Sequence, residues 1–146
     1  MKALQCTELG GPEKLIVSEV LDPIIAAEHV IIEVKSASVN FPDVLMIQGL
    51  YQFQPPLPFT PGGESAGIIT EIGDGVDNFK VGDRVFAATG IGGISEKILA
   101  HHSSIRIIPE KMDFEIAAAL SVTYGTSIHA LKPVSYTHLT LPTMCV

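Results

Sequence analysis

Short apolar runs separated by turn residues are the feature that most restricts how this 146-residue chain can fold. Six or seven of these runs can be interpreted as β-strands, because each is bounded by turn-forming residues such as glycine, proline or aspartate. They span residues 1–7, 14–20, 30–37, 66–72, 81–86 (a tight turn that feeds a strand), 94–100 and 105–108. The polar alternation slips near the end of residues 30–37, which suggests a bulge. So many short strands predict a closed or nearly closed β-barrel.

The character of the chain changes after Pro109, where helix-forming residues replace the strands. Asp113 can cap a helix that continues to Leu120, since an aspartate oxygen satisfies backbone N–H groups at a helix start. Residues 123–126, Thr-Tyr-Gly-Thr, interrupt this pattern, and a second helix is predicted to begin directly after them and to run to Lys132. The sequence therefore predicts a β portion followed by short helices.

Composition and charge exclude several classes of protein. A hydrophobic content of 47% and a mean hydropathy of +0.38 suit one globular domain. The net charge of −7 disfavours a nucleic-acid or anionic membrane partner. No apolar run approaches the ~20 residues that span a bilayer, and the N-terminus lacks a signal peptide's apolar core, so a cytoplasmic location is expected.

Two cysteines, Cys6 and Cys145, are too few for a disulfide framework or a four-cysteine zinc site. Cys6 lies in a strand-like run and is predicted to be a small buried hydrophobe. The histidines His29, His101, His102 and His129 have no carboxylate or cysteine at ligand spacing in the sequence. We interpret His101 and His102 as a solvated strand end, and no metal site is predicted.

The loop between residues 38 and 67 carries the candidate site. Asn40 follows an apolar strand, Asp43 stands just past a proline, and Tyr51 follows a glycine; a short helical turn can form over residues 43–49. Further on, Pro-Gly-Gly-Glu places two glycines before Glu64, so the backbone can approach another group closely. The carboxylate of Glu64 precedes an apolar strand and should be partly buried with a partner. This pattern can form the wall of a site; a surface connector is the alternative.

Five segments, taken in order, resemble the zeta-crystallin-like quinone oxidoreductases of the medium-chain dehydrogenase/reductase superfamily. They are MKALQCTELGGPEKL, SASVNFPDVLMIQGLY, PFTPGGESAGIITEIGDGV, FKVGDRVFA and FEIAAALSVTYGTSIHAL. The resemblance implies that residues 1–122 form a mainly β, GroES-like catalytic domain, a partly open β-barrel with short helices. It also implies that residues 123–133 begin the helix that enters a Rossmann cofactor-binding domain missing from this chain, since no Gly-x-Gly-x-x-Gly turn is present.

Zinc-dependent alcohol dehydrogenases of this superfamily carry a cysteine where this chain has Asn40 and a histidine where it has Gly63. An amide and a hydrogen atom cannot hold Zn²⁺, which binds thiolate, imidazole or carboxylate. The relatives' structural zinc lobe is also missing, because no cysteine lies between Cys6 and Cys145. The resemblance therefore implies a zinc-free branch.

The resemblance also implies the chemistry: hydride transfer from NADPH to the conjugated carbonyl of a quinone or enone. Without a metal, hydrogen bonds from the Asn40 amide and the Tyr51 hydroxyl would polarise that carbonyl, and Asn40 would also lie beside the cofactor. NADPH rather than NADH, and a homodimeric parent enzyme, rest on the resemblance alone.

Three further residues have two predicted roles each. Asp43 would orient the site or cap the turn after Pro42. Thr126 would contact the nicotinamide side of the cofactor or cap the second helix. Glu64 would form an ion pair, with Arg84 or with an arginine further along the parent chain, or, less favoured, would take part in proton transfer.

Residues 134–146, VSYTHLTLPTMCV, contain no charged residue and match nothing in the family. Written as codons, residues 134–143 resemble the translated end of a transposon-based sequencing adapter, so we interpret this tail as non-native and expect it to be poorly ordered. The sequence thus predicts the N-terminal part of an NADPH-dependent quinone or enone oxidoreductase, inactive as it stands. The alternatives are an enoyl-thioester reductase, a non-catalytic GroES-like or crystallin-type structural protein and, disfavoured by Asn40 and Gly63, a zinc alcohol dehydrogenase.

Overall fold

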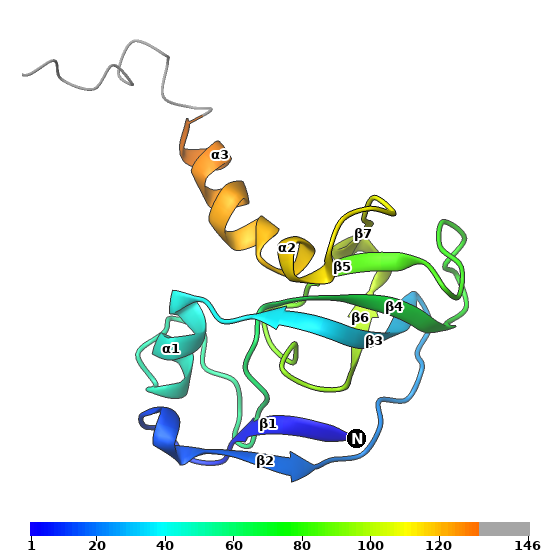
Figure 1. The fold of residues 1–146 in the computed structure, drawn as a ribbon. Helices are drawn as coiled ribbons and strands as arrows, with labels where there is room; N and C mark the ends of the chain where they lie inside the picture. The colour runs from blue at the N-terminus through cyan, green and yellow to red at the C-terminus, as the bar shows by residue number, and fades with distance from the viewer. Residues whose placement is uncertain (132–146) are drawn as a thin grey trace, which may run out of the picture.

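The computed structural model describes residues 1–131, and seven antiparallel strands form two sheets in this part of the chain (Figure 1). Strands β1 (Lys2–Cys6) and β2 (Leu15–Glu19) form a two-stranded sheet. The second sheet has five strands in the order β6-β3-β4-β5-β7. Its strands are β3 (His29–Ser38), β4 (Glu64–Ile72), β5 (Arg84–Ala88), β6 (Lys97–His101) and β7 (Ile105–Ile107). The prediction of a mainly β chain is confirmed.

Isolated bridges, rather than a continuous ladder, connect β1 to segments that precede β6 and β4 of the five-stranded sheet. Ala3 pairs with Ser95, and Cys6 pairs with Phe59, whose backbone groups exchange hydrogen bonds of 2.8 and 3.1 Å. The structure is therefore the partly open barrel that the resemblance implies.

Strand β3 is irregular, as its sequence predicts. Its pairing with β4 shifts register between Ile31 and Ile32 and again between Val34 and Ser36. Opposite the second shift, a Cβ atom placed on Gly67 would lie 2.0 Å from the Glu33 carbonyl oxygen. Glycine at this position lets the two strands approach more closely than any side chain would allow.

Three apolar clusters hold the elements together. The largest is formed mainly by side chains of the five-stranded sheet. The second lies beneath α1 (Phe41–Ile47), and the third packs α2 (Phe114–Ala118) against β4 and β5. Their buried members are, in that order, Val30, Ile32, Ile69, Val76, Val85, Ala87, Ile98, Ala100 and Ile105; Cys6, Met46, Ile47 and Phe59; and Ala66, Ile108, Ala117 and Ala118. Two short 3₁₀ turns, Pro12–Lys14 and His102–Ser104, precede β2 and β7.

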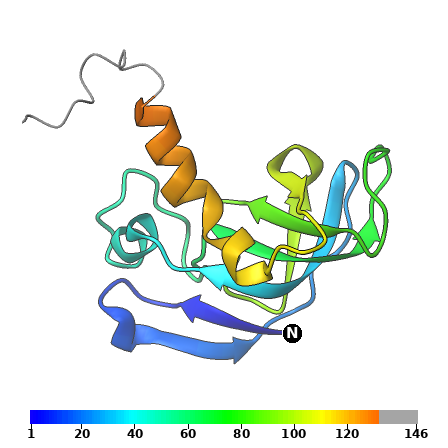
Figure 2. The ribbon, with the colours of Figure 1, turned by 45° about the horizontal axis from the view of Figure 1, so that its top comes forward.

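The interruption predicted at residues 123–126 is wrong, because the chain stays helical there. A π-helical turn, Ser121–Gly125, joins α2 to α3 (Thr126–Leu131), and Figures 1 and 2 show this run rising away from the sheets. The Thr123 hydroxyl donates to the Ala119 carbonyl, and the Ser127 hydroxyl donates to the Thr123 carbonyl at 2.8 Å. Side chains thus satisfy carbonyls that the widened turn leaves exposed.

Ile128 and Leu131 on α3 are 53% and 48% exposed. No helix within residues 1–131 is long and apolar enough to cross a membrane. The predictions for the end of the helix and for the tail at 134–146 concern residues outside the described part.

Candidate functional site

A cavity of about 270 Å³ opens where α1, the loop after it, the ends of β4 and β5, and the π-helical turn meet. Asn40 and Tyr51, which were predicted to polarise a substrate together, both line it. The full lining is Asn40, Pro42, Asp43, Met46, Tyr51, Phe53, Gly63, Ala88, Gly90 and Val122. The two predicted hydrogen-bonding side chains therefore share one hollow.

One wall of the cavity is bare backbone. A Cβ atom on Gly63 would lie 3.4 Å from the Gly90 carbonyl oxygen, so the two glycines face each other closely. Gly90 has a φ of +81° and nothing within 4 Å of the place its Cβ would take. A flat ring can therefore lie against this wall without meeting a side chain.

Glu64 is the centre of a hydrogen-bond network behind this wall. Its side chain is 1% exposed, and no cation contacts it among residues 1–131. Its Oε2 accepts from the Ser38 hydroxyl at 3.1 Å and from the Asn40 amide at 3.2 Å. Its Oε1 accepts from the backbone N–H of Val122 at 2.6 Å. Three neutral donors, rather than an ion pair, satisfy the buried carboxylate.

The network fixes the orientation of the Asn40 amide. Asn40 Nδ2 donates to the Ser38 hydroxyl at 2.9 Å as well as to Glu64. Ser38 gives its one hydrogen to Glu64 and so must accept from Asn40; a flipped amide would instead set its oxygen against the carboxylate. Both amide hydrogens are used, so Asn40 can meet a ligand only through Oδ1, which also faces the Asp43 backbone N–H in the capping box at the start of α1. This arrangement does not support the predicted donation from the Asn40 amide to a substrate carbonyl.

Asp43 ties the start of α1 to the glycine turn. It is 4% exposed; Oδ2 accepts from the Asn40 backbone N–H at 2.8 Å, and Oδ1 accepts from the Gly62 N–H at 3.0 Å. The bond from Asn40 caps the start of α1, one of the two roles predicted for Asp43. The bond from Gly62 holds the glycine turn beside the cavity, which is consistent with the other predicted role, orienting the site. With both oxygens occupied, Asp43 acts by position.

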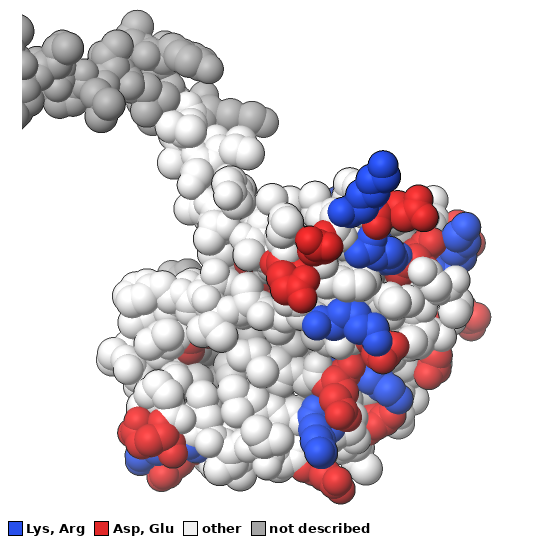
Figure 3. Space-filling model, in the orientation of Figure 1, with Lys and Arg blue, Asp and Glu red and all other residues white. Residues whose placement is uncertain are grey.

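Tyr51 is half-buried and packs beside the cluster under α1. Its hydroxyl has no hydrogen-bond partner among residues 1–131, so it can donate to a molecule in the cavity. The surface around the opening is apolar: Phe41 is 73% exposed and Phe53 56%. Figure 3 shows few charges over α1 and α3, whereas charged side chains gather over the five-stranded sheet.

Thr126 is exposed on α3 and does not line the cavity, so its predicted contact with the nicotinamide side stays a prediction. Val122, one helical turn earlier, does line the cavity. Sequence reasoning missed Val122 because it contributes a backbone N–H, which no side-chain pattern reveals. It also missed Ser38, whose position two residues before Asn40 was the available signal.

The predicted ion pair between Glu64 and Arg84 is wrong. The Arg84 guanidinium donates to the carbonyl oxygens of Pro109 (3.2 Å), Glu110 and Met112 (2.6 Å), and it stacks 4.4 Å from the centre of the Phe114 ring. Arg84 therefore anchors the loop that leads into α2. The pairing failed because Arg84 lies opposite Ile68 in the ladder between β4 and β5, whereas Glu64 lies at the other end of that ladder, opposite Ala88.

Neither Cys6 nor the cavity offers the groups of a zinc site. Cys6 is fully buried, and burial first, then the nearby charge of Glu8, raises the pKa of its thiol. The predicted role as a small buried hydrophobe is confirmed. Among the residues that line the cavity, Asp43 is the single carboxylate and there is no histidine or cysteine. Because both Asp43 oxygens are bonded, this donor set does not suit a zinc ion.

Comparison with known proteins places this geometry in a family. The model of the alcohol dehydrogenase GroES-like domain matches residues 26–110. Quinone oxidoreductase-like protein 2 of Bos taurus is 40% identical over 131 residues, covering 90% of this chain and 37% of that protein. Quinone oxidoreductase of Rattus norvegicus is 41% identical over 133 residues, covering 90% and 40%. The chain thus spans about 40% of the length of the curated relatives it matches.

Solved structures agree. The Escherichia coli quinone oxidoreductase complexed with NADPH superposes with a TM-score of 0.81 at 34% identity, covering 90% of this chain and 40% of that one. The family match includes Asn40, Tyr51 and Glu64, the residues that build the cavity and its network. The chain belongs to the alcohol dehydrogenase GroES-like domain family of the medium-chain dehydrogenase/reductase superfamily, and the relatives it is similar to are quinone oxidoreductases, as the resemblance in its sequence implies.

Proposed function

We propose that this chain forms the substrate side of the active site of an NADPH-dependent quinone or enone oxidoreductase that works without zinc. The observation that carries the proposal is the shared cavity: Asn40 and Tyr51 line one hollow, together with Gly63, Gly90 and Val122 of the π-helical turn. The chain by itself is proposed to be inactive, since a cavity of this size holds a ring and not a dinucleotide.

The cavity suits one flat ring, either the ring end of a nicotinamide cofactor or a planar substrate. Gly63 and Gly90 line the cavity without side chains, so a planar group can lie against their backbone. NADPH, when bound, supplies the hydride. The Escherichia coli relative complexed with NADPH supports this choice of cofactor.

Tyr51 is the donor in this proposal. Its hydroxyl would donate to the substrate carbonyl oxygen, where negative charge develops during hydride transfer. The apolar surroundings of the cavity, including Met46 and Phe53, lower the local dielectric and strengthen that hydrogen bond. A single donor of this kind is worth about 10²–10³ in kcat in enzymes that stabilise an oxyanion.

Asn40 is proposed to act as an acceptor. Its Oδ1 would receive an N–H or O–H group of the bound cofactor, such as a carboxamide or a hydroxyl, while its hydrogens stay on Ser38 and Glu64. Glu64 is then a positioning residue, and because it also holds the Val122 N–H it connects the orientation of Asn40 to the helix that leaves the domain.

Assaying the complete product of the parent gene tests this proposal. NADPH and NADH would be offered with small 1,4-quinones, with simple enones and with 2-enoyl thioesters, and metal content would be measured on the same preparation. Reduction of quinones or enones with NADPH, unaffected by a chelator, is expected. Activity restricted to enoyl thioesters, dependence on stoichiometric zinc, or no binding of either nicotinamide cofactor would each contradict it.

A further inference from the structure

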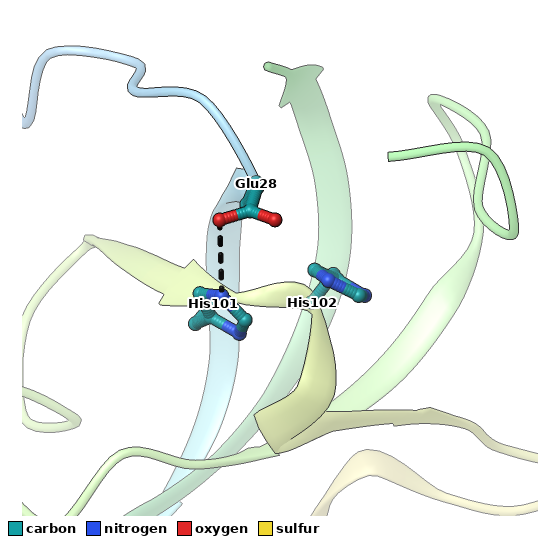
Figure 4. A group of neighbouring side chains, drawn as sticks. All are labelled: Glu28, His101 and His102. Atoms are coloured by element: carbon teal, nitrogen blue, oxygen red, sulfur yellow. Dashed lines mark ion pairs between the residues drawn. The ribbon is translucent and has the colours of Figure 1, made fainter. Parts of the chain in front are cut away.

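Three potential metal ligands lie together at the other end of β3 from the cavity. Glu28 immediately precedes β3, and His101 and His102 lie at the junction of β6 and the following 3₁₀ turn. Figure 4 shows Glu28 facing His101, with His102 beside them. Since β3 runs from residue 29 to 38, this cluster is separated from Asn40 by roughly 30 Å along the strand. It belongs to neither the cavity nor its network.

Backbone pairing fixes the three residues relative to one another. His29, next to Glu28, pairs with His101 in the ladder between β3 and β6. The His102 N–H donates to the Glu28 carbonyl oxygen at 3.0 Å. Residues more than 70 positions apart in the sequence are thus held together before any ion binds, which is why ligand spacing in the sequence gave no signal.

The distances fit a metal ion after small side-chain rotations. Each of the three residues offers a ligand atom within 4.8 Å of the other two, and His101 Nε2 lies 3.9 Å from Glu28 Oε2. Tetrahedral zinc with bonds of about 2.0–2.1 Å holds its ligand atoms about 3.4 Å apart. Contraction by up to about 1.4 Å is within reach of side chains that are exposed or half-buried, because their terminal torsions are soft.

Ser103 holds the ring of His101 in place. Its backbone N–H donates to His101 Nδ1 at 3.2 Å, and its hydroxyl oxygen lies 2.8 Å from the same nitrogen. With Nδ1 as an acceptor, the proton of the neutral ring is on Nε2, so a metal ion that binds at Nε2 must displace it. The displaced proton can move to Nδ1, where the Ser103 hydroxyl oxygen can accept it, as the partners of metal-binding histidines do.

We infer that Glu28, His101 and His102 form a binding site for a divalent transition-metal ion, with Zn²⁺ as its natural probe. Two imidazoles and a carboxylate, completed by water, are a donor set that Zn²⁺ accepts. The overall charge of −7 favours cation binding at this solvated edge. A bound ion would clip β6, the edge strand of the five-stranded sheet, to the start of β3.

Calorimetric titration of the purified 146-residue chain with ZnSO₄ tests the inference. One ion per chain is expected, with shifts of the His101 and His102 ring resonances in NMR spectra. His101→Asn should weaken binding at least about tenfold, because losing a direct ligand costs no less than losing an outer-shell partner. The matched control is His129→Asn on exposed α3, which should leave binding unchanged.

A second variant guards against misfolding. Glu28 has a φ of +61°, a conformation that asparagine adopts more readily, so Glu28→Asn should fold at least as well and still lose the carboxylate ligand. Its thermal midpoint without zinc should equal or exceed that of the parent chain, and its zinc affinity should fall. Failure to bind zinc, equal binding by all variants, or a thiolate charge-transfer band with Co²⁺ (which would assign the ion to Cys145) would overturn the inference. None of these results depends on the proposed reductase activity.

Discussion

The orientation of one amide decides what the cavity can do. Asn40 would be a donor if its side chain were loose, but Glu64 and Ser38 take both of its hydrogens. That leaves Tyr51, which lines the same cavity, as the proposed donor. The residues Asn40 and Tyr51 could be selected from the sequence because their types and their loop suited a site. Their division of labour could not, because it depends on a carboxylate 24 positions beyond Asn40.

Replacing Glu64 tests this network at the residue scale. In Glu64→Gln, the new side-chain NH₂ group would point at either the Val122 N–H or the Asn40 amide, and both of these groups are hydrogen-bond donors themselves. We expect the free energy of unfolding to fall by about 1–3 kcal/mol, since a buried donor is left unsatisfied. Urea titration measures the loss, and ¹⁵N spectra should show displaced side-chain resonances for Asn40.

The matched control is Glu71→Gln, an exposed glutamate on the same strand β4, which should change stability by no more than about 0.5 kcal/mol. If Glu64→Gln behaved like this control and left the Asn40 resonances in place, the network would not hold the amide.

The positions of the strands were predicted better than any other feature. Glycine and proline mark the ends of strands in the sequence, because these residues interrupt β-pairing in any fold. The bulge in β3 was visible as a slip in alternation. The π-helical turn was not predictable, since Thr-Tyr-Gly-Thr reads equally well as a break or as a widened turn. The turn survives because hydroxyl groups on Thr123 and Ser127 bond to nearby carbonyls.

Two glycine-to-alanine substitutions should change stability in opposite directions, one through steric clash between strands and one through helix propensity. Gly67→Ala would drive a methyl group to 2.0 Å from the Glu33 carbonyl oxygen, so β3 and β4 must part. We expect a loss of at least about 3 kcal/mol in the free energy of unfolding, at the upper end for overpacking. Gly125→Ala, with nothing within 4 Å of the new carbon, should instead gain about 0.5–1 kcal/mol.

Chemical denaturation of both variants measures these changes. A stable Gly67→Ala protein would mean that the pairing of β3 with β4 is looser than its geometry indicates. A destabilised Gly125→Ala protein would mean that the π-helical turn needs glycine.

Exposed ion pairs connect three segments at the open edge of the molecule. Asp22 accepts from the N-terminal amine at 3.0 Å and also pairs with Lys97, linking β1, the segment after β2, and β6. These contacts are exposed, so each contributes modestly. The hydrogen bond from Lys97, then that from the N-terminus, lowers the pKa of Asp22, and the hydrogen bond to Asp22 raises the pKa of Lys97.

The pH dependence of stability follows from these directions. Asp22 stabilises the fold above its pKa in the unfolded chain, and the contribution is lost as the pH falls through the lowered folded value. Lys97 stabilises the fold below the usual lysine pKa and loses its contribution as the pH rises through the raised folded value. Both contributions are present near neutral pH.

Asp22→Asn should therefore unfold with a shallower loss of stability between about pH 5 and pH 2 than the parent chain. Thermal midpoints over this range measure the slope, with Asp74→Asn, another exposed aspartate, as the control. Identical slopes for parent and Asp22→Asn would show that this contact does not close the edge.

The central claim concerns Tyr51, and the turnover of Tyr51→Phe in the complete enzyme tests it most directly. With saturating NADPH and a small quinone, kcat should fall about 10²-fold while KM for the cofactor stays within a few fold, because the hydroxyl acts on developing charge. Tyr124→Phe, which removes the hydroxyl of an exposed tyrosine outside the cavity, should keep the parent kcat. An unchanged kcat in Tyr51→Phe would contradict the account.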